Sequence, residues 1–261
     1  MPPIDPSVPD LLVSDLFVET CGDGPPVVVV PGLGATTNAY LDLATRLSAR
    51  HRVTRFDLPG AGRSPRRASV ALPDLVALLA DLVDTVAAGA VTLVGHSFGT
   101  LIAQHLAARH PDRIAGLVLL GPIREQPPAA KAAARARAEL GRRDGLIAVA
   151  DALVAAATSS HTRAEHPLTA AFIRELVLGQ PPHGYASLAE SLADAAPADL
   201  SAITAPALLI TGADDVLAPP AATEVLAADL PSASVRVLDM VGHWTALEAP
   251  EPVAAAITEF L

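Results

Sequence analysis

Short runs of apolar residues alternate along this chain with longer segments whose apolar residues recur at helical spacing. The short runs indicate buried β-strands, and the helical spacing indicates amphipathic helices. Their alternation predicts an α/β fold, in which a mostly parallel, doubly wound sheet carries helices on both faces. The predicted strands are Val27–Val30, Val53–Phe56, Val91–Val94, Gly116–Leu120, Ala207–Thr211 and Val235–Leu238, with Leu16–Glu19 as an antiparallel edge strand. The predicted helices lie near Tyr40–Ala49, Asp74–Ala87, Ser97–Arg109, Ala221–Ala228 and Pro250–Leu261.

The alternation stops between Gly121 and about Asp199. In this segment proline and glycine separate helical stretches such as Ala129–Leu140, Leu146–Ala157 and Leu168–Leu178. A helical insertion between two strands is typical of a lid over the end of a sheet. We therefore expect residues 1–121 and 200–261 to form the α/β core and residues 122–199 to form an inserted helical lid.

One serine occupies a position suited to a nucleophile. Residues 93–99 read Leu-Val-Gly-His-Ser-Phe-Gly, an apolar strand that runs into a G-x-S-x-G pentapeptide. A helical segment follows directly, so Ser97 is expected on a sharp strand-to-helix turn. The glycines leave room for strained backbone angles, and the helix N-terminus directs free N–H groups toward developing negative charge. The alternative is a chance pentapeptide, and the strand and helix on either side of it argue against chance.

A serine hydroxyl becomes a good nucleophile only when a base removes its proton and a third group orients that base. The chain offers both downstream of Ser97, each just after a predicted strand. These segments are Gly212-Ala-Asp-Asp215 and Asp239-Met-Val-Gly-His243. The order serine, aspartate, histidine is the one expected of a nucleophile-elbow hydrolase.

Three further segments join this pattern. Val30-Pro-Gly-Leu-Gly34 resembles an oxyanion loop, Asp57-Leu-Pro-Gly-Ala-Gly-Arg-Ser64 resembles a D-x-P-G-x-G-x-S turn, and Gly242-His243-Trp244 resembles a G-H-[FW] segment. With the pentapeptide, and in this order, they make the chain similar to the α/β-hydrolase family. The resemblance covers residues of about 25–125 and 200–261, which is everything except the predicted lid.

The resemblance implies a role for each matching residue. Ser97 would be the nucleophile, His243 the general base, and Asp215, at the G-x-x-D spacing from Gly212, the carboxylate that orients His243. Two less favoured candidates for the acid remain open. Asp214 is adjacent to Asp215, and Glu125 follows the strand after the nucleophile, from which some hydrolases of this fold take their acid.

The resemblance also implies an oxyanion hole formed by the backbone N–H groups of Leu33 and Phe98. One departure concerns the loop before it, where Pro31-Gly32 stands in place of the family's common His-Gly. Proline cannot supply the histidine side chain that helps to pin this loop. Three residues are expected to contact substrate: Gly32, His183 and Trp244.

A serine nucleophile favours acyl transfer over the chemistry of haloalkane dehalogenases and epoxide hydrolases, which use a carboxylate. We therefore expect a small-molecule carboxylic ester or lactone as substrate. Residues 182–195 and 199–203 are similar to the end of the cap in 3-oxoadipate enol-lactonases, whose charged substrate would need cationic lid residues such as Arg124, Arg163 and Arg174. The alternatives are a cofactor-free haloperoxidase or perhydrolase, a C–C bond hydrolase, and a non-catalytic ligand-binding protein of the same fold.

Composition excludes several other classes. A formal net charge of −10 and 3% aromatic residues argue against a nucleic-acid surface. No apolar run approaches the ~18 residues of a membrane span. Cys21 is the only cysteine, which rules out an intrachain disulfide, and the N-terminus lacks the features of a signal peptide, so we expect a cytoplasmic protein. No histidine pair has the spacing of a metal site, and we expect neither metal nor cofactor. The oligomeric state stays open.

Overall fold

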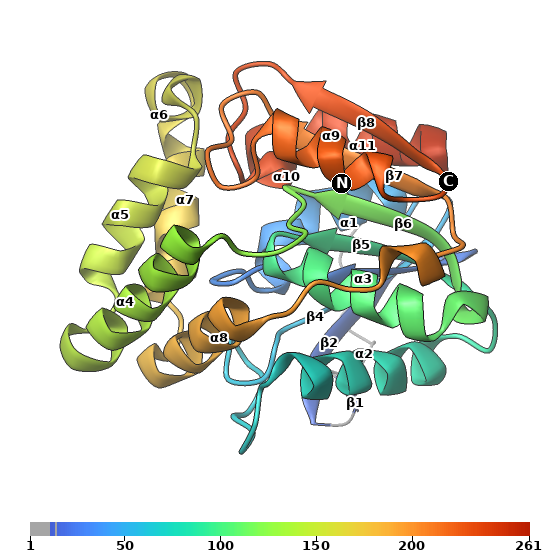
Figure 1. The fold of residues 1–261 in the computed structure, drawn as a ribbon, viewed down its shortest axis with the longest axis horizontal. Coiled ribbons are helices and arrows are strands. Elements are labelled where there is room, and N and C mark those ends of the chain that lie inside the picture. Colours follow the sequence, from blue (N-terminus) through green and yellow to red (C-terminus); the bar gives the residue numbers. More distant parts are fainter. Residues whose placement is uncertain (1–10, 14) are drawn as a thin grey trace.

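The computed structural model describes residues 11–13 and 15–261, so the expectations for residues 1–10 lie outside the described part (Figure 1). Its centre is an eight-stranded sheet with the order β1-β2-β4-β3-β5-β6-β7-β8. The six strands from β4 to β8 in this order run parallel, whereas β1 and β2 are antiparallel additions. The predicted α/β class is therefore confirmed. The strands are β1 (Leu11–Val13), β2 (Leu16–Cys21), β3 (Pro26–Val30), β4 (Arg52–Phe56), β5 (Val91–His96), β6 (Ile114–Leu120), β7 (Ala207–Gly212) and β8 (Ala233–Leu238).

One strand prediction is wrong in part. Residues 16–19 do form an antiparallel strand, but β2 is not the edge of the sheet because β1 pairs with its outer side. All six predicted parallel strands are present, each extended by one or two residues. The helices are α1 (Leu41–Leu47), α2 (Leu72–Val86), α3 (Phe98–Arg109), α4 (Pro128–Asp144), α5 (Ile147–Ala157), α6 (Ser160–Glu165), α7 (Pro167–Leu178), α8 (Pro182–Asp194), α9 (Pro220–Ala228), α10 (Thr245–Glu248) and α11 (Pro250–Phe260).

Helices α6, α8 and α10 are not among the predicted helices. Two prolines and Gly184 open α8, and such residues are typical of a loop. Proline at the first helical position nevertheless lacks only an N–H that would have no partner within the helix. The α8 side chains of Tyr185, Leu188 and Leu192 are buried, so tertiary packing stabilises this helix.

Both faces of the sheet are covered. On one face α2 and α3 pack in an apolar cluster that includes Leu79 and Leu101. On the other, α1 and α11 pack in a second cluster that includes Leu43 and Ile257. Strands β5 and β7 are buried along their whole length, which explains why they read as continuous apolar runs rather than as alternating ones.

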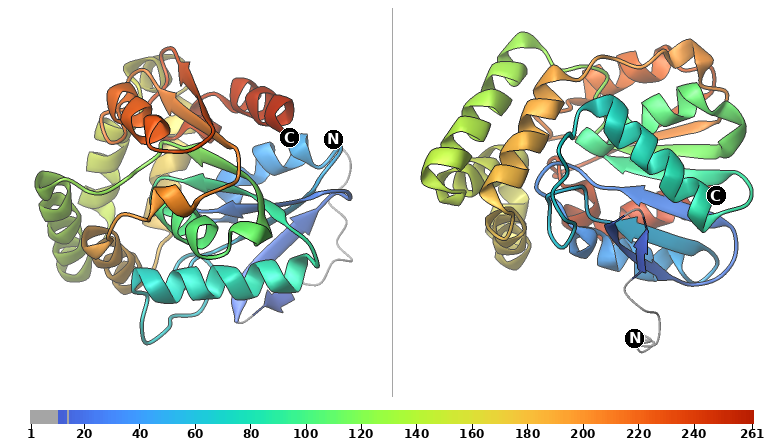
Figure 2. Two further views of the ribbon diagram at one scale, coloured as in Figure 1. Left: turned by 45° about the vertical axis from the view of Figure 1, so that its right-hand side comes forward. Right: turned by 90° about the horizontal axis from the view of Figure 1, so that it is seen from below.

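Between β6 and β7 this fully described stretch of chain forms only helices. Helices α4 to α8, here called the inserted helices, lie together at one side of the sheet in all three views, beyond the ends at which the parallel strands finish (Figures 1 and 2). They share a small apolar core that includes Leu146, Val149 and Tyr185. No described helix has the length and apolar content to cross a membrane.

Two contacts fasten the inserted helices to loops of the sheet. Gln180, just after α7, donates to the carbonyl oxygen of Gly34 over 3.3 Å and accepts from the N–H of Gly62 over 3.2 Å. Gly184 in α8 packs so closely on Gly60 that an added Cβ would lie 1.9 Å from the Gly60 carbonyl oxygen. These loops follow β3 and β4, so the inserted helices are attached at the carboxyl ends of the strands.

Strand order reverses at β3. The chain passes from β3 to β4 on one side and then returns through α2 to β5 on the other side of β3. Ligands of doubly wound sheets bind at the carboxyl ends of the strands next to such a reversal. The loop after β3 and the turn after β5 both lie there.

Candidate active site

Ser97 occupies a strained turn between β5 and α3. Its φ of +52° is rare for a residue other than glycine. The flanking glycines are required by close contacts. A Cβ at Gly99 would lie 2.2 Å from the carbonyl oxygen of Val30, and one at Gly95 would lie 2.8 Å from that of Gly99. The glycines of G-x-S-x-G therefore allow β5, α3 and β3 to pack closely against one another around Ser97.

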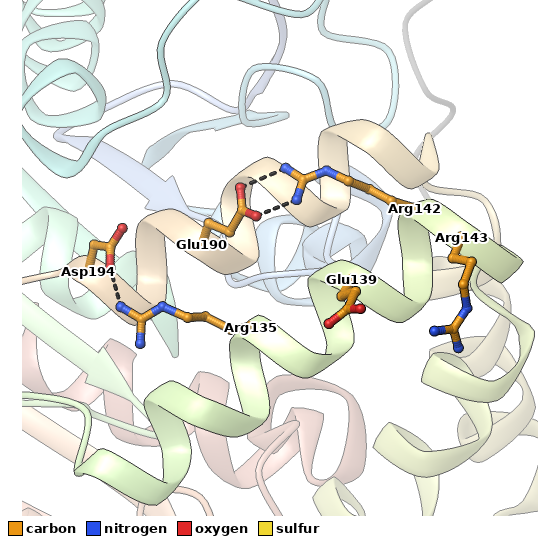
Figure 3. Close-up of a pocket in the computed structure, with 6 residues that line it drawn as sticks. All are labelled: Arg135, Glu139, Arg142, Arg143, Glu190 and Asp194. Carbon is orange, nitrogen blue, oxygen red and sulfur yellow. Dashed lines mark hydrogen bonds and ion pairs between the residues drawn. The ribbon is translucent and has the colours of Figure 1, made fainter.

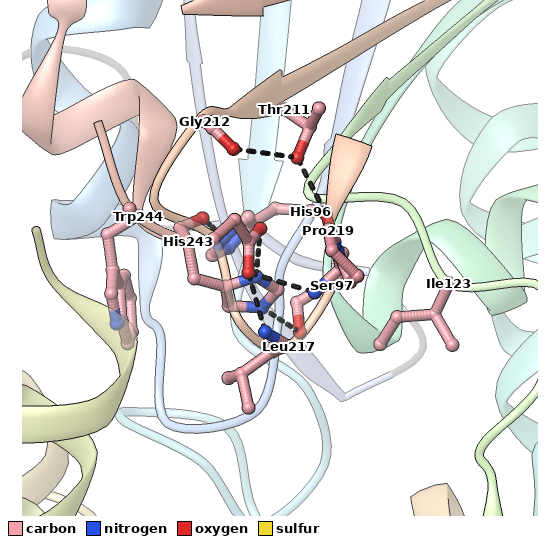
Figure 4. A network of polar contacts seen from close by, with 12 residues as sticks. His96, Ser97, Ile123, Thr211, Gly212, Leu217, Pro219, His243 and Trp244 are labelled. Atoms are coloured by element: carbon pink, nitrogen blue, oxygen red, sulfur yellow. Dashed lines mark hydrogen bonds and ion pairs between the residues drawn. The ribbon is translucent and has the colours of Figure 1, made fainter. Parts of the chain in front are cut away.

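The structure brings three of the predicted site residues into one hydrogen-bonded chain. His243 Nε2 lies 2.8 Å from Ser97 Oγ, and His243 Nδ1 lies 2.8 Å from Asp215 Oδ2 (Figure 4). The side chains of Asp215 and His243 are almost fully buried. A neutral imidazole that donates its Nδ1 proton to Asp215 presents a lone pair on Nε2 to the serine hydroxyl.

The Asp215 carboxylate is held from both sides. While Oδ2 faces His243, Oδ1 accepts from the backbone N–H groups of Leu217 and Ala218, each over 2.8 Å. Burial by itself raises the pKa of Asp215, but His243 and these two N–H groups outweigh it and bring the pKa below its usual range. Asp215 is therefore ionised at neutral pH and fixed in orientation.

The other two acid candidates lie apart from this chain. Asp214 precedes Asp215 but has an exposed side chain, and its backbone N–H bonds to Val241. Glu125 is also exposed, on the loop between β6 and α4. Gly121, at the start of that loop, packs on the imidazole, because an added Cβ there would lie 2.9 Å from His243 Cε1.

The loop after β3 lies against the serine. A Cβ at Gly32 would lie 3.1 Å from Ser97 Cβ and 2.9 Å from His96 Nδ1, so only glycine fits here. Leu33 follows, with a partly exposed side chain. Phe98 is the first residue of α3, where backbone N–H groups have no partner within the helix.

The remaining two predicted contacts are placed differently. His183 lies in the first turn of α8, and its side chain is exposed to solvent. Trp244 is buried, and its ring packs 5.3 Å from the ring of His96 within the apolar cluster on the α1 and α11 face. The His183 side chain thus faces solvent, and the Trp244 ring lies against the His96 ring.

In the described part of the chain, no cluster of three or more histidine, cysteine, aspartate or glutamate side chains could hold a metal ion. The chemistry available to the described groups is that of a hydroxyl, an imidazole and a carboxylate in line.

Comparison with known proteins identifies the family of the fold. Residues 25–250 match the family model for the alpha/beta hydrolase fold. The chain belongs to the α/β-hydrolase fold family. The family predicted from the motifs is therefore confirmed, over a longer stretch than the motifs covered.

Several members of the α/β-hydrolase family are similar over nearly the whole chain. The pimeloyl-[acyl-carrier protein] methyl ester esterase of Chromobacterium violaceum is 33% identical over 254 residues, which are 95% of this chain and 98% of that protein. A thermophilic esterase from Thermogutta terrifontis superposes with a TM-score of 0.88 at 30% identity, covering 94% of this chain and 92% of that one. The enol-lactonase from Burkholderia xenovorans LB400 gives 0.86 at 27% identity, covering 96% and 98%.

Sequence reasoning missed one carboxylate of this α/β hydrolase. Glu248, in α10, accepts from the N–H groups of Gly242 and Trp244, each over 3.0 Å, and so holds the backbone on both sides of His243. Its Oε2 also accepts from the N–H of Ser159 over 2.9 Å and the hydroxyl of Thr162 over 2.8 Å. The motif around His243 ends four residues before this glutamate, so only the fold reveals the connection.

The arginines considered for a charged substrate are engaged elsewhere. Arg124 pairs with Asp229, and Arg174 pairs with Asp151 over 2.6 Å. Arg163 donates to the carbonyl oxygen of Thr158 at the end of α5. Each cation is thereby held by a partner in its own neighbourhood.

A hollow on the surface of the inserted helices is also filled with charge pairs. It lies between α4 and α8, and Arg142 forms a two-pronged pair with Glu190 across it while Arg135 pairs with Asp194 (Figure 3). Its lining residues are Arg135, Glu139, Arg142, Arg143, Glu190 and Asp194. None of them belongs to the chain of Ser97, His243 and Asp215.

Proposed function

We propose that this protein is a serine hydrolase that cleaves a carboxylic ester or lactone through an acyl-enzyme intermediate. The observation that carries the proposal is the pair of 2.8 Å contacts that joins Ser97, His243 and Asp215. In this reading Ser97 is the nucleophile, His243 the general base and then the acid, and Asp215 the group that orients His243.

The reaction follows from the positions of these atoms. As Ser97 Oγ attacks the carbonyl carbon, its proton moves to His243 Nε2, and the carbonyl oxygen becomes an oxyanion. The bond to the leaving oxygen then breaks, and the imidazolium returns the proton to that oxygen. Water attacks the acyl-enzyme in the same way and releases the carboxylic acid and free Ser97. In a lactone the leaving oxygen stays tethered to the acyl group.

The backbone N–H groups of Leu33 and Phe98 are proposed to stabilise the oxyanion. They belong to the loop packed on Ser97 and to the first residue of α3, which supports this assignment. A donor of this kind contributes roughly 3 kcal/mol to the transition state.

The surroundings favour a substrate without a free carboxylate. Ile123 and Leu217 are apolar residues on the loops that flank the elbow and the acid, and Arg124, Arg163 and Arg174 are bound to other groups. We propose an uncharged ester or lactone and assign residues 122–199 as the lid that encloses it. Relatives with ester and enol-lactone substrates in their names support the choice of reaction class.

The test is a panel of p-nitrophenyl esters of increasing chain length together with small and macrocyclic lactones, run on wild type and Ser97→Ala. Turnover of uncharged esters or lactones that is lost in Ser97→Ala is the expected result. Turnover confined to substrates with a free carboxylate would overturn the substrate class. Halogenation that depends on peroxide in carboxylate buffer, without hydrolysis, would point to a haloperoxidase instead.

A further inference from the structure

A chain of buried hydrogen bonds links the loop after β3 to the loop that carries His243. The N–H of Gly32 donates to Tyr40 Oη over 3.1 Å, and Tyr40 Oη lies 2.9 Å from His96 Nδ1. On the other side of the ring, His96 Nε2 lies 3.0 Å from the carbonyl oxygen of His243. Tyr40 and His96 are each about 2% exposed.

The direction of each bond is determined. A carbonyl oxygen only accepts, so His96 Nε2 carries the proton that bonds to His243. Burial, with a smaller contribution from the neighbouring His243, lowers the pKa of His96 to about 3, so the ring is neutral and Nδ1 has a lone pair. Tyr40 therefore donates its hydroxyl proton to Nδ1 and accepts the Gly32 N–H on its oxygen. Each ring nitrogen of His96 thus has one partner, and the Tyr40 hydroxyl has two, one as donor and one as acceptor.

The loop after β3 needs such an anchor. Pro31 has no N–H, so Gly32 supplies the first backbone donor of the loop. Gly32 also packs against the carbonyl oxygen of His96 and the Cβ of Ser97, and the peptide that follows it carries the N–H of Leu33. A hydrogen bond at Gly32 therefore fixes the orientation of the neighbouring peptide that faces the substrate.

We propose that Tyr40 and His96 are positioning residues that hold the oxyanion loop and the loop of His243 in fixed positions relative to each other and to Ser97. The inference rests on the proposed hydrolase function for its kinetic consequence. Both ends of the path lead to groups that act on the tetrahedral intermediate. Loss of the path should therefore weaken binding of that intermediate more than binding of the substrate.

The kinetic test is Tyr40→Phe, which removes only the hydroxyl. Because displacement of an oxyanion donor costs less than its removal, kcat should fall by about tenfold to hundredfold with KM nearly unchanged. The inhibition constant of an alkyl trifluoromethyl ketone, whose adduct carries the oxyanion, should rise by a similar factor. The matched control is Tyr185→Phe, since Tyr185 is the other tyrosine of the chain and is equally buried.

A second variant and a structural measurement on wild type test the inference even if Tyr40→Phe does not fold. His96→Asn removes the donor that reaches the His243 carbonyl and should show the same split between kcat and KM. In wild type, the nitrogen chemical shifts of His96 should report the tautomer with the proton on Nε2. The Gly32 amide should resist hydrogen exchange in wild type and lose that protection in Tyr40→Phe.

The outcomes separate this inference from the hydrolase proposal. A wild type without acyl-transfer activity would defeat the proposed function, while the His96 tautomer and the Gly32 amide would still test the path. An active wild type whose Tyr40→Phe variant keeps its kcat, or loses kcat no more than Tyr185→Phe does, would overturn the inference. A proton found on His96 Nδ1 would overturn it as well.

Discussion

His243 donates its backbone N–H to the carbonyl oxygen of Ala157 over 2.9 Å. Ala157 is the last residue of α5, so the histidine loop and the inserted helices share a direct hydrogen bond. The preceding residue is also in tight contact, because a Cβ at Gly242 would lie 2.7 Å from the backbone nitrogen of Ser159. A displacement of this part of the inserted helices would therefore displace His243.

Glu248 should contribute most to the attachment of the His243 loop to the inserted helices. Glu248→Ala removes the acceptor of four hydrogen bonds, and we expect the free energy of unfolding to fall by about 2–4 kcal/mol and kcat to fall with it. Glu248→Gln retains one acceptor oxygen, which can serve the three donors now bound to Oε2, and should lose less. Urea denaturation and ester kinetics of both variants provide the measurement. Equal stability of wild type and Glu248→Ala would show that the carboxylate holds nothing in place.

The close approach of α8 to the sheet predicts a large effect of one methyl group. In Gly184→Ala the Cβ would meet the carbonyl oxygen of Gly60, so α8 must move, at a cost of about 1–3 kcal/mol. Thermal or urea unfolding measures the cost. The matched control is Gly89→Ala, because no atom lies within 4 Å of a Cβ there. If both variants were as stable as wild type, the inserted helices would not rest on this contact.

The assignment of the acid can be tested with isosteric changes. Asp215→Asn should lower kcat by about 10⁴, because an amide cannot hold the histidine in the required tautomer. Asp214→Asn and Glu125→Gln serve as matched controls, since both side chains are exposed and should leave kcat unchanged. Steady-state kinetics on a p-nitrophenyl ester decides the matter. A large loss in Glu125→Gln with an active Asp215→Asn would move the acid to the loop after β6.

Burial of His96 predicts a pH dependence of stability. The unfolded chain takes up a proton on this histidine near pH 6.5, whereas the folded protein resists protonation down to about pH 3. The unfolded state therefore binds more protons in this range, and the free energy of unfolding decreases as the pH falls. From pH 7 to pH 5 the contribution of His96 is a loss of about 2 kcal/mol.

Urea unfolding at pH 7 and pH 5 measures this contribution. His96→Gln lacks the titrating ring and should lose about 2 kcal/mol less than wild type over the interval. His110→Gln, which removes an exposed histidine, is the matched control. An identical pH dependence in wild type and His96→Gln would mean that the buried ring does not resist protonation.

The strands and the three residues of the proposed triad could be predicted because their signals are local. Each strand is a short apolar run, and Ser97, Asp215 and His243 lie one, three and five residues after the end of such a strand. Parallel strands bring their carboxyl ends to one edge of the sheet. That residues at these positions lie close together can therefore be predicted without knowing how the side chains pack.

The supporting contacts could not be predicted because their partners are distant in the chain. Tyr40 and His96 are 56 residues apart, and Thr162 and Glu248 are 86 apart. Nothing in the short sequence around a buried tyrosine or a helical glutamate reveals which backbone groups the fold will bring to it. The same holds for Trp244, which is expected from the sequence to contact substrate and whose ring packs against His96.

The central claim, that Ser97 forms a covalent acyl-enzyme, is tested most directly by mass spectrometry after incubation with an alkyl fluorophosphonate. We expect one phosphonyl group per chain on the peptide that contains Ser97, with loss of ester hydrolysis at the same rate. His243→Ala should react far more slowly, and Ser97→Ala should not react. An unmodified Ser97, or full hydrolytic activity in Ser97→Ala, would contradict the account.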